Sequence, residues 1–354
     1  MRNRNRSGLT MLDVAVTIVI LLILAALLIP SFSRQRYSGA SRRSQCKNNL
    51  KQIGLALMNY HDVHRTFPPG WIVSAEQDRS SGFGWGYHLL PFFDQAPLFK
   101  KFDSHEKLSG EASGNTKLAA TILTAMRCPS DEGKDQVNSR WMSDLGSSNY
   151  IGNFGIGIPT SYSRLAESKG NIADTRSVQG MLGANTRVRI RDVKDGMSNV
   201  ILVGERRQSA DGVEWPAGKI EGRFNSYWAG IPQVGAVSPL AIVATATGGE
   251  FEGSTRDEDG NWSALPLFGN VDAVASEKGR QKLTYFGINR DVQGKPLKTV
   301  ESTTSVTAGF SSWHTGGCQV VLGDGTVRFL SENIDPIVFT NLMRRSDGKT
   351  LGEF

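Results

Sequence analysis

Two histidines near the middle of a polar segment are spaced so that they could share a metal ion. His61 and His64 are three residues apart, with Asp62 between them. On a helix, positions i and i+3 lie on one face, so both imidazoles could reach one zinc ion. A third ligand is not evident nearby. We therefore expect a polar helix end here and not a metal site.

A second group of acidic residues resembles half of a calcium loop. The segment TRDEDGNW, residues 255–262, contains Asp257, Asp259 and Gly260. If Gly260 takes the sixth position of an EF-hand loop, Pro266 takes the twelfth, where a bidentate glutamate is required. An EF-hand is excluded, and Asp257 and Asp259 remain candidates only for another kind of calcium loop. We predict no other cofactor.

The C-terminal region pairs a histidine with an acidic turn. His314 is followed by nine residues and then by Asp324 and Gly325, which separate two short alternating runs. An Asp-Gly pair in that setting favours a hairpin with a two-residue type I′ turn. We expect Asp324 to form the turn and His314 to be buried and hydrogen-bonded elsewhere. The chain has none of the G-x-S-x-G, P-loop, H-E-x-x-H or dinucleotide motifs, and we predict no catalytic residues and no enzyme.

The chain has three cysteines, Cys46, Cys128 and Cys318. They are too few and too far apart for a zinc ribbon. In an oxidising compartment Cys46 and Cys128 could form a disulfide that closes a loop of 128 − 46 = 82 residues, and otherwise they are two buried thiols. Both alternatives remain open at this point. Cys318 is expected in the core.

These candidates must be positioned by an N-terminal helix and the body that follows it. Residues 9–29 are almost all apolar and would span about 31 Å as a helix, which matches the hydrocarbon thickness of a bilayer. The arginines before this run place the N-terminal tip in the cytoplasm and the body outside it, as in a single-pass protein of the inner membrane. A cleaved secretory signal or a buried soluble helix fits the length less well. The basic tip consists of Arg2, Arg4 and Arg6.

Asp13 is the exception within this apolar run. A carboxylate at the bilayer centre costs about 2.5–3.5 kcal/mol and less near the interface. Asp13 could lean back to the headgroups, or it could pair with a cation at the same depth. A new amino terminus on a neighbouring copy, made by cleavage after Gly8, would be such a cation.

The region after Pro30 predicts a second half of the same helix. Its apolar positions, spaced four and three residues apart, form one stripe that Pro68 and Pro69 end. We expect one helix from Leu9 to about His64, kinked at Pro30, with its outer half packed on the body. The stripe consists of Cys46, Leu50, Ile53, Leu57 and Tyr60.

The body is predicted to be rich in β-strands, which makes the fold class α+β with an antiparallel sheet. Residues 200–205, VILVGE, read as a buried strand, and residues 212–305 read as loop-rich insertions. The expected organisation is a basic leader (1–8), a transmembrane helix (9–30), an amphipathic helical stalk (31–66) and an extracytoplasmic globular domain (67–354). The formal charge of +6 is too small and too scattered to favour nucleic acid as a partner.

The N-terminal residues resemble the type IV prepilin cleavage and methylation signal. In that family a prepilin peptidase cuts after the glycine, here Gly8, and methylates the new first residue, here Leu9. The family's acidic residue, usually Glu and here Asp13, neutralises the terminal amine of an adjacent subunit. A proline where the helix leaves the membrane, here Pro30, is also common. The resemblance implies a membrane location and partners that are pilin-like subunits or further copies of this chain.

The body is similar to a large pilin-like family of planctomycete-type bacteria, catalogued as domain of unknown function 1559. The C-terminal match is the motif of His314, nine residues, Asp324 and Gly325. Our leading hypothesis is a pilin-like or pseudopilin-like subunit of a type IV pilus or a type II secretion-like machine. The alternative is a monomeric, membrane-tethered protein that binds a solute or carbohydrate, with its pocket in residues 212–305. The other matching segments are QCKNNLKQIGLALMNYHDVHRTFPPG, GWGYHLLPFFDQAPLFKKFD, RCPSDE, SNYIGNFG and IRDVKDGMSNVILVGERR.

Overall fold

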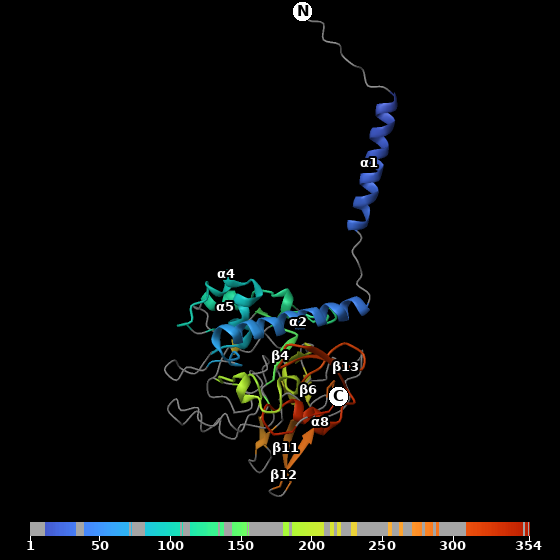
Figure 1. Ribbon diagram of the computed structural model, residues 1–354. Coiled ribbons are helices and arrows are strands. Elements are labelled where there is room, and N and C mark those ends of the chain that lie inside the picture. The colour runs from blue at the N-terminus through green and yellow to red at the C-terminus, as the bar shows by residue number, and fades with distance from the viewer. Residues whose placement is uncertain are drawn as a thin grey trace, which may run out of the picture. The chain divides into compact units, whose positions relative to one another are not determined.

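The structure is a computed structural model of the 354-residue chain. It describes residues 11–32, 39–70, 82–106, 114–133, 144–153, 186–208 and 309–349, together with shorter pieces between and after them. Side chains of the first helix are described to residue 24. By contacts, residues Met1–Ser41 and Arg42–Phe354 form two compact units, and Figure 1 labels their elements.

The helices are α1 (Met11–Phe32), α2 (Gly39–His64), α3 (Trp85–Leu89), α4 (Ala96–Phe99), α5 (Gly114–Ala119) and α8 (Pro336–Leu342), with 3₁₀ turns η1 (Leu90–Phe93), η2 (Thr124–Met126), η4 (Ile190–Asp192) and η5 (Met197–Asn199). The strands are β1 (Gly82–Phe83), β2 (Gln136–Val137), β3 (Leu145–Gly146), β4 (Tyr150–Gly152), β5 (Ile201–Glu205), β6 (Val213–Trp215), β7 (Gly218–Ile220), β8 (Gly230–Ile231), β9 (Ser254–Arg256), β10 (Trp262–Ala264), β11 (Val271–Glu277), β12 (Arg280–Tyr285), β13 (Gly317–Leu322) and β14 (Val327–Ser331).

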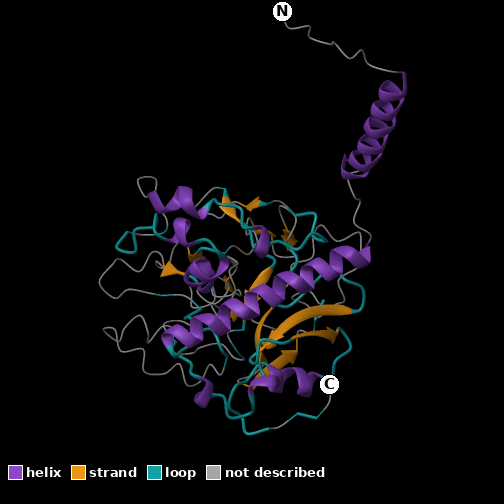
Figure 2. Cartoon of the chain, turned by 45° about the horizontal axis from the view of Figure 1, so that its top comes forward, coloured by secondary structure: helices purple, strands orange, loops and turns teal. Residues whose placement is uncertain are grey.

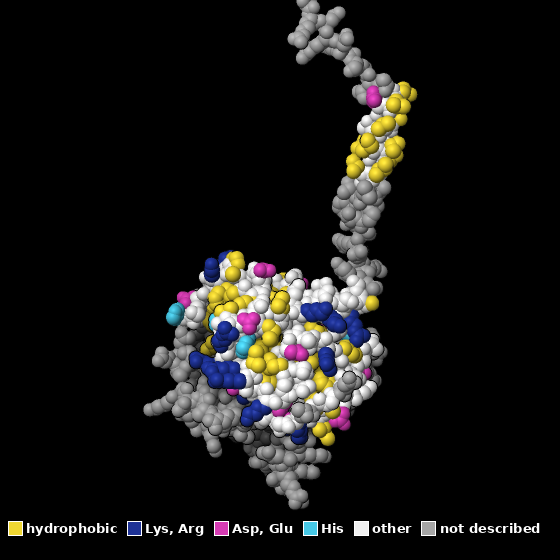
Figure 3. Space-filling view, viewed as in Figure 1, with side chains coloured by type: hydrophobic (Ala, Val, Ile, Leu, Met, Phe, Trp, Pro, Cys, Tyr) yellow, Lys and Arg dark blue, Asp and Glu magenta, His cyan; other side chains and the backbone are white. Residues whose placement is uncertain are grey.

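Helix α1 is almost entirely apolar, and Asp13 and Thr17 are the polar residues among its described side chains. All its described side chains, residues 11–24, are exposed, and Figure 3 shows hydrophobic side chains over the described length of the helix. Asp13 lies in the first turn, where the helix dipole favours a negative charge. In the part of the chain that the structure describes, no helix reaches the combination of length and hydropathy that a membrane crossing needs.

The predicted single helix from residue 9 to 64 appears as two described helices. Helix α1 ends at Phe32 and α2 begins at Gly39, and residues 33–38 lie outside the described part of the chain. Pro30 lies inside α1, but its side chain is not among those described. The continuity of the helix and the kink at Pro30 therefore stay predictions.

Helix α2 packs its apolar stripe against the body, as predicted. Cys46, Leu50, Ile53 and Leu57 are fully buried, and Tyr60 is half-buried. The helix ends at His64 because Arg65 adopts a left-handed φ of 59°, ahead of the two prolines. Figure 2 shows this long helix lying along the body beside the strands.

A four-stranded antiparallel sheet, ordered β14-β13-β5-β4, forms the centre of the body. Strand β5 pairs on both sides, with β13 and with β4, and it is buried at every position because hydrophobic clusters cover both faces of the sheet. Side chains that alternate along the strands enter two separate clusters, as the period of a strand requires. Tyr150 and Val321 join the cluster that contains the α2 stripe, whereas Ile151 and Val320 join the cluster that contains α8. The sheet therefore lies between α2 and α8.

The predicted hairpin is confirmed, but the predicted turn type is wrong. Strands β13 and β14 pair antiparallel, and the Gly325 N–H donates to Leu322 O at 2.9 Å. A type I′ turn requires a positive φ at both of its central residues. Gly325 has a φ of 82°, but the φ of Asp324 is not positive. The loop is longer than two residues because the Thr326 carbonyl closes it by accepting from Leu322 N at 2.9 Å.

Two further features differ from the sequence expectation. Helix α8 was not predicted, although Asp335 caps it by accepting from the Ile337 and Val338 N–H groups at 2.8 and 3.1 Å. Residues 212–305, predicted to be loop-rich, contain the antiparallel hairpins β6–β7, β9–β10 and β11–β12. The parts of that region outside these strands are mostly not described, which includes residues 257–261 with Asp257 and Asp259.

Candidate functional site

A disulfide fastens α2 to the body. Cys46 on α2 is bonded to Cys128, which follows η2, and their Cα atoms are 5.0 Å apart. One helical turn along α2, the Asn49 side chain donates to the Arg127 carbonyl at 2.6 Å. The Tyr150 hydroxyl donates to the Cys46 carbonyl at 3.4 Å. The loop residues Arg127 and Cys128 are therefore held to the helix by one hydrogen bond and one covalent bond, and strand β4 is held to it by the Tyr150 hydroxyl.

A buried histidine and glutamate lie against this disulfide. Glu205 is the last residue of the central strand β5, and His314 precedes β13. His314 Nε2 is 3.3 Å from Glu205 Oε1, and the two side chains are 4% and 2% exposed. The other oxygen, Glu205 Oε2, accepts from the Gln319 N–H at 2.8 Å. The pairing of β5 with β13 thus fixes the carboxylate next to the imidazole.

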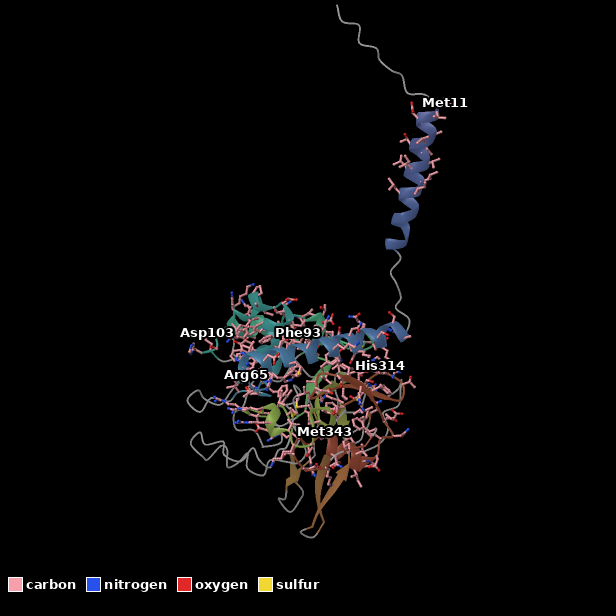
Figure 4. All side chains as sticks on the ribbon, viewed as in Figure 1. Met11, Arg65, Phe93, Asp103, His314 and Met343 are labelled. Carbon is pink, nitrogen blue, oxygen red and sulfur yellow. A yellow bond between two sulfur atoms is a disulfide. The ribbon has the colours of Figure 1, made fainter. Side chains whose placement is uncertain are left out.

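The four side chains form one compact centre. His314 Nε2 is 3.7 Å from Cys128 Sγ, so the imidazole lies between the carboxylate and the disulfide. One donor atom from each of Cys46, Cys128, Glu205 and His314 lies within 4.8 Å of all the others. We call these four residues the disulfide centre, and Figure 4 labels His314 in it. Sulfur, imidazole nitrogen and carboxylate oxygen are the donors that zinc takes in proteins.

Burial and the Glu205 carboxylate together raise the pKa values of two groups around the disulfide centre. Burial first, and then the Glu205 carboxylate, raise the pKa of the Tyr150 hydroxyl well above its ordinary value. The same two causes, in the same order, raise the pKa of the buried Cys318 thiol. Both groups therefore stay protonated at neutral pH. Cys318 lies in the core as expected, as a free thiol.

A cavity of about 10 Å³ adjoins the centre, which is room for about one water molecule. In its lining the Arg207 guanidinium stacks on the Trp313 ring, 3.5 Å from the ring centroid. Burial lowers the pKa of Arg207, and Asp131 opposes that shift. The cavity is too small for a sugar ring. Its lining consists of Cys128, Asp131, Asn149, Glu205, Arg206, Arg207, Ser311, Ser312 and Trp313.

His61 and His64, the two helix histidines considered as metal ligands, contact different aromatic rings. The His61 ring lies 5.0 Å from Phe67, whereas the His64 ring lies 4.2 Å from Tyr60. Burial lowers the pKa of His61, and the pKa of the neighbouring His88 falls to about 4 for the same reason, reinforced by His64. Among the described residues, the group with metal-ligating geometry is the disulfide centre and does not include them.

The remaining candidates are separate from one another. Gly8 and Leu9 lie outside the described residues, and Asp13 lies in α1. Asp324 is in the β13–β14 turn, where its carboxylate accepts from Thr326 N at 2.9 Å and from Thr326 Oγ1 at 2.7 Å. His314 and Asp324 therefore have different partners, as expected from the hairpin.

Glu205 is the functional candidate that the sequence reasoning missed. Its signal was a charged residue at the end of the apolar run VILVG, a position that the strand buries. Buried carboxylates are rare unless they are paired, so a glutamate at the end of a buried strand is expected to have a hydrogen-bonding or charged partner. Which partner it takes depends on strand pairing between distant segments, which local sequence does not show.

Comparison with known proteins places the body in one family. The profile of the family described as "Protein of unknown function (DUF1559)" matches residues 38–337. No match was found among curated proteins or among solved structures. The matched range includes the whole disulfide centre and the segment from His314 to Gly325.

Proposed function

The chain belongs to the DUF1559 family of proteins of unknown function, and we propose that it is a membrane-anchored, prepilin-like subunit. In this proposal a prepilin peptidase cuts after Gly8 and methylates Leu9. The apolar helix crosses the inner membrane with its N-terminus in the cytoplasm, and the body lies outside. The subunit assembles into a type IV pilus or a type II secretion-like pseudopilus, and its role is structural and not enzymatic.

The exposed apolar surface of α1 is the main support for this proposal. Its described large apolar side chains other than Met11 and Leu12 are between 44% and 63% exposed, and those two are more exposed still. Burial of apolar surface contributes about 25 cal/mol per Å², so a helix that is apolar all round is unstable in water without a cover. Lipid covers such a helix in the membrane, and neighbouring copies cover it in a filament. The apolar run of the sequence extends beyond these side chains, to residue 29.

The disulfide supports the placement of the body. Disulfides persist in oxidising compartments and are rare in the cytosol. A body stapled by Cys46 and Cys128 fits the periplasm or the cell surface, the side that the arginines before α1 predict. The membrane orientation expected from the arginines and the oxidised state of the two cysteines therefore favour the same location for the body.

Asp13 supports assembly over simple anchoring. A plain anchor gains nothing from a carboxylate within an apolar helix, and insertion is less favourable with it. A subunit whose neighbour presents a free amino terminus at the same depth gains an ion pair in a medium of low dielectric constant. The charge then fixes the axial register between copies.

The intact mass of the protein extracted from membranes of its native host tests the processing. We expect a chain that starts at Leu9 and carries one added methyl group. A chain that retains residues 1–8 would overturn prepilin processing and leave a signal anchor. A chain that starts beyond Pro30 would overturn membrane anchoring as well.

The substitution Asp13→Ala tests assembly. Between a tagged and an untagged copy in one membrane, we expect co-purification to fall by at least about 10-fold, which corresponds to about 1.4 kcal/mol of lost association energy. Resistance to carbonate extraction should not change, because α1 becomes more apolar. Asp13→Glu should retain association.

Asp62→Ala is the matched control, since it removes an exposed acid from α2. Unchanged co-purification in Asp13→Ala would contradict the assembly role and favour the monomeric, tethered ligand-binding protein.

A further inference from the structure

We propose that the disulfide centre is also a zinc site, which forms when the Cys46–Cys128 bond is reduced. In the oxidised protein the two sulfur atoms bond to each other. In the reduced protein the two thiolates, His314 Nε2 and Glu205 Oε1 bind one Zn²⁺ ion. This inference concerns the body only, and it does not depend on the membrane or assembly roles proposed above.

The donor set matches the chemistry of zinc. Structural zinc sites are tetrahedral and use thiolates and imidazoles, with bond lengths of about 2.0–2.3 Å, and carboxylates are also accepted. Those bond lengths place the donors about 3.3–3.8 Å apart along the edges of the tetrahedron. The four donor atoms here already lie within 4.8 Å of one another. A shift of about 1 Å, together with separation of the two sulfur atoms, completes the geometry.

An independent observation at Glu205 points to a ligand. Glu205 Oε1 is buried and lies 3.3 Å from His314 Nε2, in ion-pair contact but without the geometry of a hydrogen bond. A buried carboxylate oxygen without a hydrogen bond is costly, and the site of such an atom is expected to hold a compensating group. A divalent cation between Oε1 and Nε2 would supply that compensation and would draw both atoms toward it.

The hydrogen bonds around Glu205 engage one carboxylate oxygen and leave the other available to bind a metal ion. Glu205 Oε2 is occupied by the Gln319 N–H, which orients the carboxylate and leaves Oε1 beside His314 Nε2. Fixed partners of this kind orient the ligands in metal sites. The cavity beside the centre reaches both Cys128 and Glu205, and it gives a water molecule or an ion a place next to the donors.

The exchange between the two states balances in electrons and protons. A small dithiol reductant transfers two electrons and two protons to the Cys46–Cys128 bond, which gives two thiols while the dithiol becomes a disulfide. Zn²⁺ then displaces two protons as the thiolates bind it. The neutral imidazole contributes the lone pair of Nε2, and the carboxylate enters already ionised. In the reverse direction a small-molecule disulfide takes two electrons from the two thiolates, which re-forms the Cys46–Cys128 bond and releases Zn²⁺, and the small molecule becomes a dithiol by taking up two protons.

The test uses the full chain in detergent, reduced with a dithiol, freed of reductant without oxygen, and mixed with Zn²⁺ or Co²⁺. We expect one equivalent of metal in the reduced protein and none in the oxidised protein, by native mass spectrometry. The Co²⁺ form should show a tetrahedral d–d spectrum and a sulfur-to-metal band of two thiolates. His314→Ala should weaken Zn²⁺ binding by at least about 100-fold, since even indirect partners of a metal ligand are worth 10–100-fold.

The matched control is Cys318→Ala, which removes the remaining cysteine and leaves the four ligands in place. Its reduced form should bind as tightly as the unchanged protein. Failure of the reduced protein to bind stoichiometric metal would overturn the proposal and leave a purely structural disulfide. A Co²⁺ spectrum that is unchanged by both His314→Ala and Glu205→Gln would overturn it too. The spectrum of the unchanged protein keeps the test decisive even if these two variants fold poorly.

Discussion

Replacing Cys46 and Cys128 together by alanine is expected to lower the free energy of unfolding of the oxidised protein by about 4 kcal/mol. The bond closes a loop of 82 residues, and in the chain-entropy model such a loop corresponds to about 4.5 kcal/mol, within the range of about 2–5 kcal/mol for native disulfides. Urea unfolding of the full chain in detergent, followed by tryptophan fluorescence, measures the change. Trp85 and Trp228 are buried and report on the body.

The control for this prediction is Cys318→Ala, which truncates a buried thiol without opening a loop. It should lower the free energy of unfolding by about 1 kcal/mol, the cost of a small cavity. Treatment of the unchanged protein with a dithiol and a zinc chelator should reproduce most of the loss seen in the double variant. Equal losses in the double variant and the control would show that the bond adds nothing beyond packing.

The buried face of α2 and the buried strand β5 could be predicted from the spacing of apolar residues within each segment. The spacing of Cys46, Leu50, Ile53 and Leu57 is a property of one helix, and it identified the buried face of α2 correctly. The apolar run that ends at Glu205 likewise identified a strand buried on both sides. Each of these signals lies within a few residues, so tertiary context did not need to be known.

The disulfide centre could not be predicted in the same way. Glu205 meets His314 because β5 pairs with β13, and residues 212–305 separate β5 from His314 and β13 along the chain. Register between distant strands is set by the whole core, which a single sequence does not display. The short helix α8 was missed for a different reason: its capping residue Asp335 and Pro336 were present, but its few apolar residues carry little periodicity.

The close contact at Gly54 was also invisible in the sequence, where glycine only weakens a helix. A Cβ atom at Gly54 would lie 2.9 Å from the Gly325 carbonyl oxygen and 3.1 Å from Val321 Cγ1. Helix α2 therefore approaches the β13–β14 turn so closely that its glycine has no room for a side chain. Gly325 is the last residue of the C-terminal motif, and His314, its first, lies against the disulfide that holds Cys46 of α2. Both ends of the motif thus hold the same helix to the sheet.

We therefore expect Gly54→Leu to lower the free energy of unfolding by about 3 kcal/mol, the upper part of the range for overpacked cores. Helix propensity acts in the opposite direction, since leucine is better than glycine in a helix by somewhat under 1 kcal/mol. The contact with a backbone oxygen decides the sign, because a backbone atom cannot rotate away as the end of a side chain can. Urea unfolding in detergent measures the change.

Gly39→Leu is the matched control, because a Cβ at Gly39, at the start of the same helix, meets no atom within 4 Å. It should change the free energy of unfolding by less than about 1 kcal/mol, the effect of helix propensity alone. Gly54→Ala is the sharpest comparison, since it adds only the Cβ atom. If Gly54→Ala stabilised the protein as propensity alone predicts, the turn at Gly325 would not touch α2. The C-terminal motif would then hold the helix through His314 and the disulfide alone.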